Sequence, residues 1–152
     1  MTALKDINTN SAEKKLILEV FVTINPADIR TLRGPAGEVV CIPFGGTAQG
    51  EIFSGTVCPG STDVQRVNLS AVRHMCARYM LEGTDFEGKP CKIFVENNGW
   101  FSGEGEMQMP FKTLPTFMTD SEALAPYLHQ NKFIGEGHPA EHGVTIKFFE
   151  VN

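Results

Sequence analysis

The sequence predicts an all-β protein built as a closed, antiparallel up-and-down β-barrel. Short runs in which apolar and polar residues alternate recur along the chain, and Gly, Pro or Asn separates almost all of them. Only one short segment has a helical pattern, so strands and long helices do not alternate as they would in an α/β fold. A β-sandwich is the alternative, because short strands at tight spacing also fit two packed sheets.

Length and composition predict one globular domain. The chain has 152 residues, of which 41% are hydrophobic and 20% are charged. We expect a polar N-terminal tail over residues 1–15 and a single barrel domain over residues 16–152. The net charge of −5 repels phosphate backbones, so we expect no nucleic-acid partner. No apolar stretch approaches the ~20 residues that span a bilayer, and no signal segment is recognisable, so we expect no membrane association and a cytoplasmic location.

The first predicted strand covers residues 16–24, where leucine, valine and isoleucine occupy alternate positions on one face until Asn25-Pro26 ends the run. Nine further segments have strand-like patterns. These are residues 38–44, 52–58, 63–69, 73–81, 91–96, 100–109, 113–118, 132–136 and 144–151. Asn98-Gly99 lies between two of them and predicts a hairpin turn.

The one predicted helix covers residues 121–128. Asp120 offers an N-cap, acidic and helix-forming residues follow it, and Pro126 limits the helix to a turn or two. We expect this helix to cover one end of the barrel.

The cysteines and histidines do not indicate a cofactor. Cys41, Cys58, Cys76 and Cys91 form no CxxC pair, so we expect reduced thiols, with two disulfides as the alternative. The segment His138 to His142 matches the HxxEH zinc pattern, but that chemistry needs a helix, and its proline and flanking glycines indicate a loop. No complete phosphate-binding loop or GxSxG elbow occurs. We therefore expect neither a metal nor another cofactor.

The aromatic residues point to the barrel interior. Eleven phenylalanines are spread through the predicted strands. Such residues fill a small barrel, and in a wider barrel they line a cavity for an apolar or aromatic ligand. The composition leaves both interpretations open.

The predicted strand 73–81 has two different faces. One carries His74, Cys76, Arg78 and Met80, and the other face is more apolar. Periodicity leaves open which face lines the interior. His74 and Cys76 share a face and are a candidate base and nucleophile, while a buried structural thiol is the alternative.

Several segments, taken together and in order, resemble one protein family over about residues 16 to 151. They are Phe44-Gly45-Gly46-Thr47 with Gly50, Gly55-Thr56-Val57, Pro59-Gly60-Ser61-Thr62-Asp63, Ala77-Arg78-Tyr79, Pro115-Thr116-Phe117 and Phe133-Ile134-Gly135-Glu136-Gly137. The set resembles the uncharacterised family known as domain of unknown function 3237. This resemblance implies a calycin-like β-barrel with a central cavity, which in this family often forms a homodimer. Val64 and Tyr127 stand where the family commonly has Trp, so the resemblance does not identify the ligand.

The resemblance also implies the candidate ligand-binding residues. The family's recurrent polar positions fall on Asp63, Arg78 and Tyr79, and His74 lies on the Arg78 face of the same predicted strand. We expect Arg78 to point into the cavity, with Asp63 as its partner. The leading functional hypothesis is a module that binds a small apolar or aromatic molecule. The alternatives are an isomerase or hydrolase that uses Asp63 and Arg78, and a structural dimer module without a ligand.

Overall fold

The computed structural model describes residues 14–102 and 109–152, and most of these residues lie in antiparallel strands. The strands are β1 (Lys15–Thr23), β2 (Arg30–Gly34), β3 (Gly37–Pro43), β4 (Gly45–Gln49), β5 (Phe53–Val57), β6 (Thr62–Asn68), β7 (Val72–Asp85), β8 (Pro90–Ser102), β9 (Phe111–Thr119), β10 (Phe133–Ala140) and β11 (Gly143–Glu150). A one-turn 3-10 helix, Pro26–Asp28, precedes β2, and one short α-helix, α2 (Ala125–Leu128), lies between β9 and β10.

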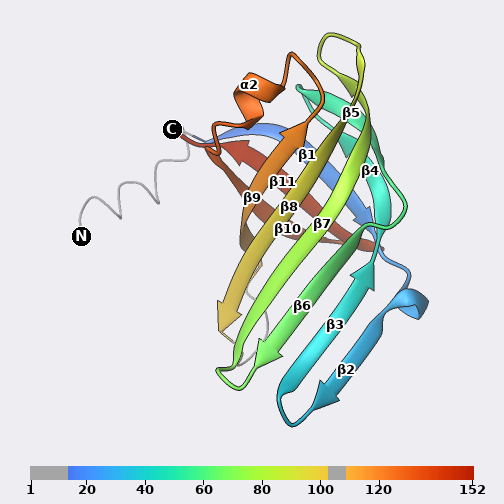
Figure 1. Cartoon of the computed structure of the whole chain (residues 1–152), viewed down its shortest axis with the longest axis vertical. Coiled ribbons are helices and arrows are strands. Elements are labelled where there is room, and N and C mark those ends of the chain that lie inside the picture. The colour runs from blue at the N-terminus through green and yellow to red at the C-terminus, as the bar shows by residue number, and fades with distance from the viewer. Residues whose placement is uncertain (1–13, 103–108) are drawn as a thin grey trace.

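Eight strands form a closed barrel, which confirms the predicted architecture and excludes the sandwich. The strand order is β7-β5-β4-β1-β11-β10-β9-β8, and the long pairing between β7 and β8 joins the two ends of this series. Each neighbouring pair is antiparallel. Figure 1 shows the strands crossing obliquely around a common interior.

Three further strands extend the sheet beyond the barrel. The second half of β7, from Leu81 to Asp85, pairs with β5, whereas its first half, from Arg73 to Arg78, pairs with β6. Strands β3 and β2 then continue outward from β6. The sheet therefore divides along β7, and β6, β3 and β2 project at the lower right of Figure 1. This division opens the lower part of the barrel wall.

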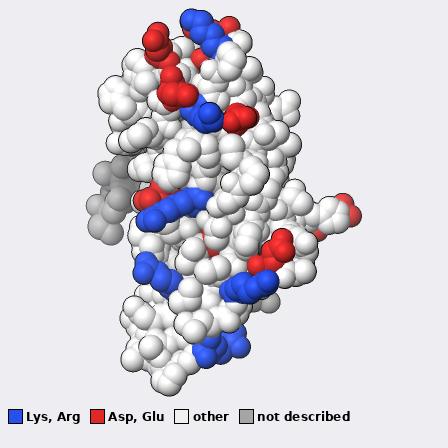
Figure 2. Space-filling view, turned by 45° about the vertical axis from the view of Figure 1, so that its right-hand side comes forward, with Lys and Arg blue, Asp and Glu red and all other residues white. Residues whose placement is uncertain are grey.

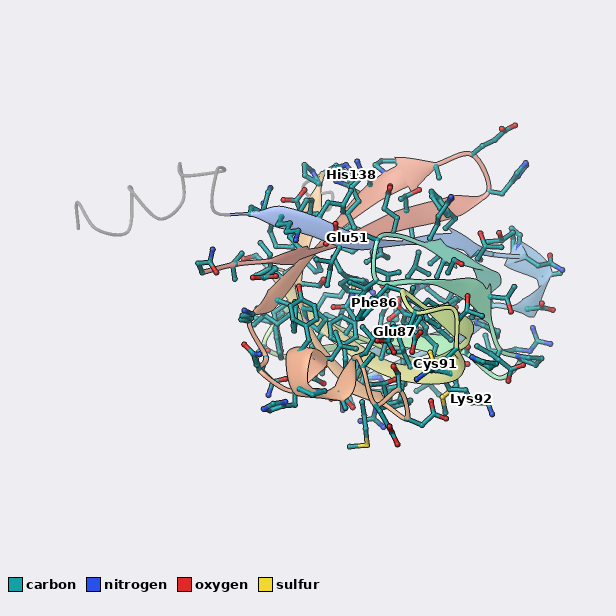
Figure 3. The ribbon with its side chains drawn as sticks, turned by 90° about the horizontal axis from the view of Figure 1, so that it is seen from above. Glu51, Phe86, Glu87, Cys91, Lys92 and His138 are labelled. Atoms are coloured by element: carbon teal, nitrogen blue, oxygen red, sulfur yellow. The ribbon has the colours of Figure 1, made fainter. Side chains whose placement is uncertain are left out.

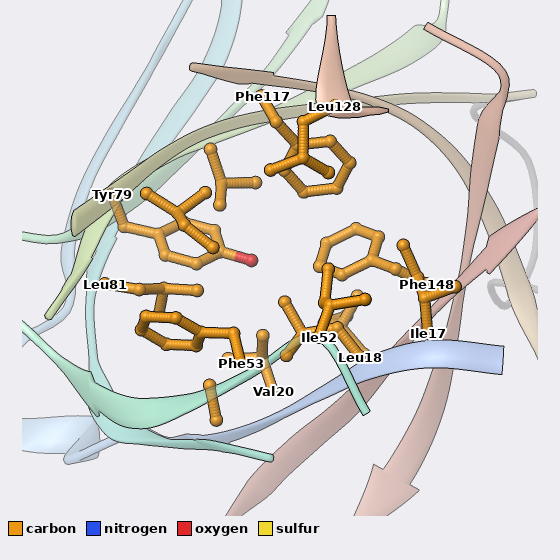
Figure 4. Packing of buried hydrophobic residues seen from close by; sticks show 14 of the residues in the cluster. Ile17, Leu18, Val20, Ile52, Phe53, Tyr79, Leu81, Phe117, Leu128 and Phe148 are labelled. Atoms are coloured by element: carbon orange, nitrogen blue, oxygen red, sulfur yellow. The ribbon is translucent and has the colours of Figure 1, made fainter. Parts of the chain in front are cut away.

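The upper half of the barrel is filled by apolar side chains. Phe53, Leu81, Ile93 and Phe148 are fully buried there, and Figure 4 shows such side chains meeting from opposite walls. Burial of apolar surface at roughly 25 cal/mol per Å² makes this cluster the main source of stability. Figure 3 shows side chains crowding the interior when it is seen from above.

Helix α2 covers the upper end of the barrel, as predicted, but it is shorter than residues 121–128. Leu124 and Leu128 bury their side chains in the core. Ser121 fixes the preceding turn, because its hydroxyl donates to Asp85 at 2.7 Å and accepts from the Leu124 amide at 3.1 Å. The predicted cap, Asp120, instead accepts the Lys92 amide at 2.7 Å and ties the turn to β8.

The predicted hairpin turn at Asn98-Gly99 is wrong. Both residues lie inside β8, where Asn98 pairs with Cys76 on one side and with Leu114 on the other. Because β7 and β9 flank this stretch, its backbone groups join two ladders, and this tertiary pairing overrides the local turn preference. The expected strand over residues 100–109 lies partly outside the described residues, as does most of the expected tail over residues 1–15.

Strands β2 and β4 were not predicted. All five residues of β2 are exposed, so this edge strand lacks the alternation that marks a half-buried strand. Strand β4 begins with two glycines, which weaken a strand signal. At Gly46, φ is +138°, and an added Cβ would lie 2.0 Å from the Phe21 carbonyl oxygen, so the close approach of β4 to β1 requires glycine.

Candidate functional site

A cavity lies inside the barrel at the end opposite α2. It is formed where β1 ends, where β9 and β11 begin, and where β3 and β6 leave the barrel wall. Its volume is about 260 Å³. Most of its wall is apolar, and its larger apolar side chains include Ile42, Phe44, Met75, Phe111, Val144 and Ile146.

Strand alternation places a few polar groups in this apolar wall. In β8, Cys91, Ile93, Val95 and Asn97 are all buried and share the inward face, so Asn97 continues an apolar row. In β9, the side chain of Thr113 points inward in the same way. Both residues line the cavity together with Asp63, Gln65 and Tyr79.

Three of these polar groups have no protein partner. Among the described residues, the buried side-chain atoms without a hydrogen bond are the Tyr79 hydroxyl, Asn97 Oδ1 and Thr113 Oγ1. All three residues line the same cavity. Buried polar atoms in folded proteins are nearly always paired, so three unpaired atoms at one cavity are an unusual concentration.

Tyr79 is held firmly in the wall. Its ring packs edge-on against Phe44 with the ring centres 5.1 Å apart. Figure 4 shows its hydroxyl directed toward the middle of the barrel. Burial, helped by the charge of Asp63, raises the pKa of Tyr79, so its hydroxyl stays protonated and can donate a hydrogen bond.

Asp63 is the carboxyl group of the cavity wall. Gln65 donates a hydrogen bond from Nε2 to Asp63 Oδ2 at 3.0 Å. Desolvation raises the pKa of Asp63, although the Gln65 hydrogen bond and the charge of His74 act in the opposite direction. A carboxyl group in this environment can both hold and release a proton.

Gln65 connects this carboxyl group to charges on the extension. Its Oε1 accepts from Arg73 Nη1 at 3.1 Å, and Arg73 Nη2 donates to Glu38 at 3.1 Å. Glu38 also pairs with Arg33. The Gln65 amide is therefore oriented from both ends, with its NH₂ group toward Asp63.

The prediction that Arg78 points into the cavity and pairs with Asp63 is wrong. Asp63 lies opposite Ala77 across the β6–β7 ladder, so Ala77 faces inward and Arg78 faces outward. The Arg78 side chain is 67% exposed and pairs with Glu96 at 3.0 Å. The more apolar face of β7 lines the interior.

His74 also lies on the outer face of β7. Its ring stacks on Trp100 with the ring centres 4.8 Å apart, and its nitrogens contact Arg66 and Asn98, each at 2.9 Å. Of the four predicted binding residues, only Asp63 and Tyr79 line the cavity. Cys76 shares the outer face with His74, away from this cavity.

The segment His138 to His142, which matches the HxxEH pattern, does not form a helix. His138 lies in β10 and contacts Glu136 at 3.2 Å, whereas His142 lies in the turn that leads to β11. All four cysteines are free thiols, and in Figure 3 His138 and Cys91 lie well apart. Over residues 14–102 and 109–152, no group of three or more His, Cys, Asp or Glu residues is arranged to hold a metal ion.

Sequence reasoning missed Gln65, Asn97 and Thr113. The signal that places Asn97 and Thr113 is the period of two in β8 and β9, once the turn expected at Asn98-Gly99 is set aside. No sequence signal reveals that their polar atoms lack partners, because this depends on strands that are distant in the chain.

The outer surface carries charges of both signs. Figure 2 shows acidic and basic side chains interspersed on one face, with broad uncharged areas between them. Within the part of the chain that the structure describes, no helix is long and apolar enough to cross a membrane.

Fold and site together define a closed β-barrel with an apolar internal cavity and a small set of polar groups in its wall. The chain belongs to the family described as "Protein of unknown function (DUF3237)", whose model matches residues 13–151. This confirms the resemblance seen in the sequence. No curated protein matches the chain.

Solved structures with the same fold come from bacteria and a fungus. A protein with unknown function from Clostridium acetobutylicum is 24% identical, with a TM-score of 0.74 over 91% of this chain and 99% of that chain. A conserved protein of unknown function from Rhodopseudomonas palustris is 24% identical, with a TM-score of 0.69 over 92% and 97%. An enzyme from Penicillium herquei is 17% identical, with a TM-score of 0.62 over 91% and 93%. At these identities the likeness shows the fold alone.

Proposed function

We propose that this protein binds a small, mostly apolar or aromatic molecule in the barrel cavity. The observation that carries the proposal is that Tyr79, Asn97 and Thr113 each have an unpaired buried polar atom and all line one apolar cavity. An unpaired buried polar atom costs about 1–3 kcal/mol. A ligand that supplies the missing partners offsets this cost, and its apolar body covers the remaining wall.

The size of the cavity limits the ligand. Its volume of about 260 Å³ is near the lower end of ordinary ligand pockets, which are about 300–1,000 Å³. A dry apolar cavity of about 150 Å³ holds benzene. The cavity therefore suits a substituted single ring or a compact pair of rings.

The first test combines a search for bound molecules with a matched pair of variants. Mass spectrometry of the purified protein identifies a compound that co-purifies, and 2-phenylethanol serves as a neutral aromatic probe. Thr113→Val removes an inward hydroxyl, and Thr116→Val makes the same change at an exposed position of the same strand. We expect Thr113→Val to weaken binding of the probe by about fivefold to tenfold and Thr116→Val to leave it unchanged. Equal effects of the two variants would contradict the proposal.

An enzyme is the second candidate, and the proximity of Asp63 to Tyr79 favours it. Asp63 and Tyr79 line the same cavity, and the charge of Asp63 contributes to the raised pKa of Tyr79. The cavity therefore contains both a group that can exchange a proton and a hydrogen-bond donor. Asp63 would act as general acid or base, and Tyr79 would stabilise developing negative charge in an isomerase or hydrolase reaction. The related fold from Penicillium herquei belongs to a protein described as an enzyme.

Incubation with the co-purified compound separates the candidates. An unchanged compound supports binding alone, and an isomer or a product of altered mass supports catalysis. A structural dimer module, the third alternative, predicts that no compound co-purifies and that the probe does not bind.

A further inference from the structure

Asp63 gives the cavity an acidic character. The described residues that line the cavity include this carboxyl group and no Lys, Arg or His. Asn97 Oδ1 adds an unpaired acceptor, and the hydroxyls of Tyr79 and Thr113 can donate or accept. The wall therefore has no cationic group to attract an anion.

Asp63 forms no salt bridge with another described residue. Gln65 donates a hydrogen bond to its Oδ2. Arg73 reaches Asp63 only through Gln65, and its guanidinium already pairs with Glu38. His74 faces away on the outer side of β7.

Three aromatic rings line the same cavity as Asp63. Phe44, Tyr79 and Phe111 line the cavity, and their ring faces attract cations. The net charge of −5 also attracts cations toward the protein from a distance. The carboxylate, the aromatic rings and the overall charge of the protein therefore all favour a positively charged ligand.

We propose that the ligand carries an ammonium group on its aromatic or apolar body, and that this group pairs with Asp63. The inference rests on the proposed function, because it names the ligand chemistry of the same cavity. The ammonium protons match the acceptors of Asp63 and Asn97, and the apolar body lies against Met75, Phe111 and Ile146. An anionic ligand would face an unpaired carboxylate inside an apolar wall.

Three compounds with one skeleton and different charges test this inference. Isothermal titration calorimetry at about pH 8, well above the ordinary pKa of a carboxyl group, compares 2-phenylethylamine, 2-phenylethanol and phenylacetate. We expect the amine to bind about tenfold more tightly than the alcohol, and phenylacetate to bind most weakly. Asp63→Asn should remove the preference for the amine, so that the amine and the alcohol bind with affinities within about threefold of each other.

Glu51→Gln is the matched control, because it removes one negative charge at an exposed position outside the cavity. It should keep the preference for the amine. If the alcohol binds as tightly as the amine, or if the preference survives in Asp63→Asn, the inference is overturned and the proposed function stands. If none of the three compounds binds, the proposed function itself is contradicted.

Discussion

Gln65 holds one oxygen of Asp63, the carboxyl group that lines the cavity. Its Nε2 donates to Asp63 Oδ2 at 3.0 Å, and its own Oε1 is held by Arg73 at 3.1 Å. The side chain therefore cannot turn its amide over without losing both bonds. This arrangement keeps a partly desolvated carboxyl group in position inside an apolar wall.

The raised pKa of Asp63 predicts how Asp63→Asn changes stability with pH. Desolvation raises this pKa in the folded state, so the folded protein holds the proton more tightly than the unfolded chain. The stability of the wild type should therefore fall, relative to the variant, as pH rises from about 4 through the folded pKa. Chemical denaturation of both proteins from about pH 3 to about pH 8 measures this difference. A variant that loses stability relative to the wild type as pH rises would contradict the assignment.

Glu136, a buried carboxyl group outside the cavity, predicts the opposite pH dependence. Burial opposes ionisation of Glu136, but hydrogen bonds from Lys14 and Lys112 outweigh it and lower the pKa to about 2. Its stabilising contribution is therefore complete above the ordinary value of about 4.3 and is lost as pH falls toward about 2. Glu136→Gln should cost about 1–2 kcal/mol of unfolding free energy at pH 7 and progressively less below about pH 4.

Glu122→Gln is the control for this measurement, since Glu122 is exposed. It should change the unfolding free energy by less than about 0.5 kcal/mol at every pH. A difference between wild type and Glu136→Gln that stays constant down to about pH 2 would show that the ion pairs do not stabilise the fold.

Gly137→Ala should reshape the cavity without touching its polar groups. An added Cβ would lie 1.9 Å from Cζ of Phe111, so the ring that lines the cavity must move. We expect a loss of about 1–3 kcal/mol in stability and weaker binding of 2-phenylethanol. Gly45→Ala is the control, because no atom lies within 4 Å of its added Cβ. Thermal unfolding and calorimetry of both variants check this, and unchanged binding in Gly137→Ala would place the ligand elsewhere.

Arg78→Met should leave ligand binding unchanged. The Arg78 side chain lies on the outer face, exposed to solvent and paired with Glu96, so it cannot touch a molecule in the cavity. Exposed pairs of this kind contribute little to stability. Calorimetry with 2-phenylethylamine and 2-phenylethanol checks the prediction. A loss of affinity of about tenfold for either compound would show that Arg78 takes part in ligand binding.

The sequence was sufficient to predict the barrel, the helix that covers one end of it, and the family to which the chain belongs. The alternating residues Leu18, Val20 and Val22 report directly on which side of β1 is buried. An irregularity in the pairing between Leu16 and Leu18 instead leaves Leu16 exposed and Ile17 buried. The extension formed by β2, β3 and β6 was not predictable, because it depends on β7 pairing with two different strands along its length.

The candidate site was predicted only in part. Tyr79 shares the apolar face of its strand with Met75 and Leu81, and this face is the inward one, although periodicity alone left the choice of face open. The inward position of Arg78 rested on the family resemblance more than on periodicity, and the register with β6 excludes it. Asn97 and Thr113 gain their significance only from unpaired atoms at a shared cavity, which no single strand reveals.

Methyl NMR of methionine-labelled protein tests the central claim most directly. Met75 and Met109 line the cavity, whereas Met80 and Met118 lie outside it with exposed side chains, so the same spectrum contains both probe and control. On titration with 2-phenylethanol and 2-phenylethylamine, we expect the methyl signals of Met75 and Met109 to shift and saturate while those of Met80 and Met118 stay in place. Saturating shifts at Met80 and Met118, with Met75 and Met109 unmoved, would show that the barrel cavity is not the binding site.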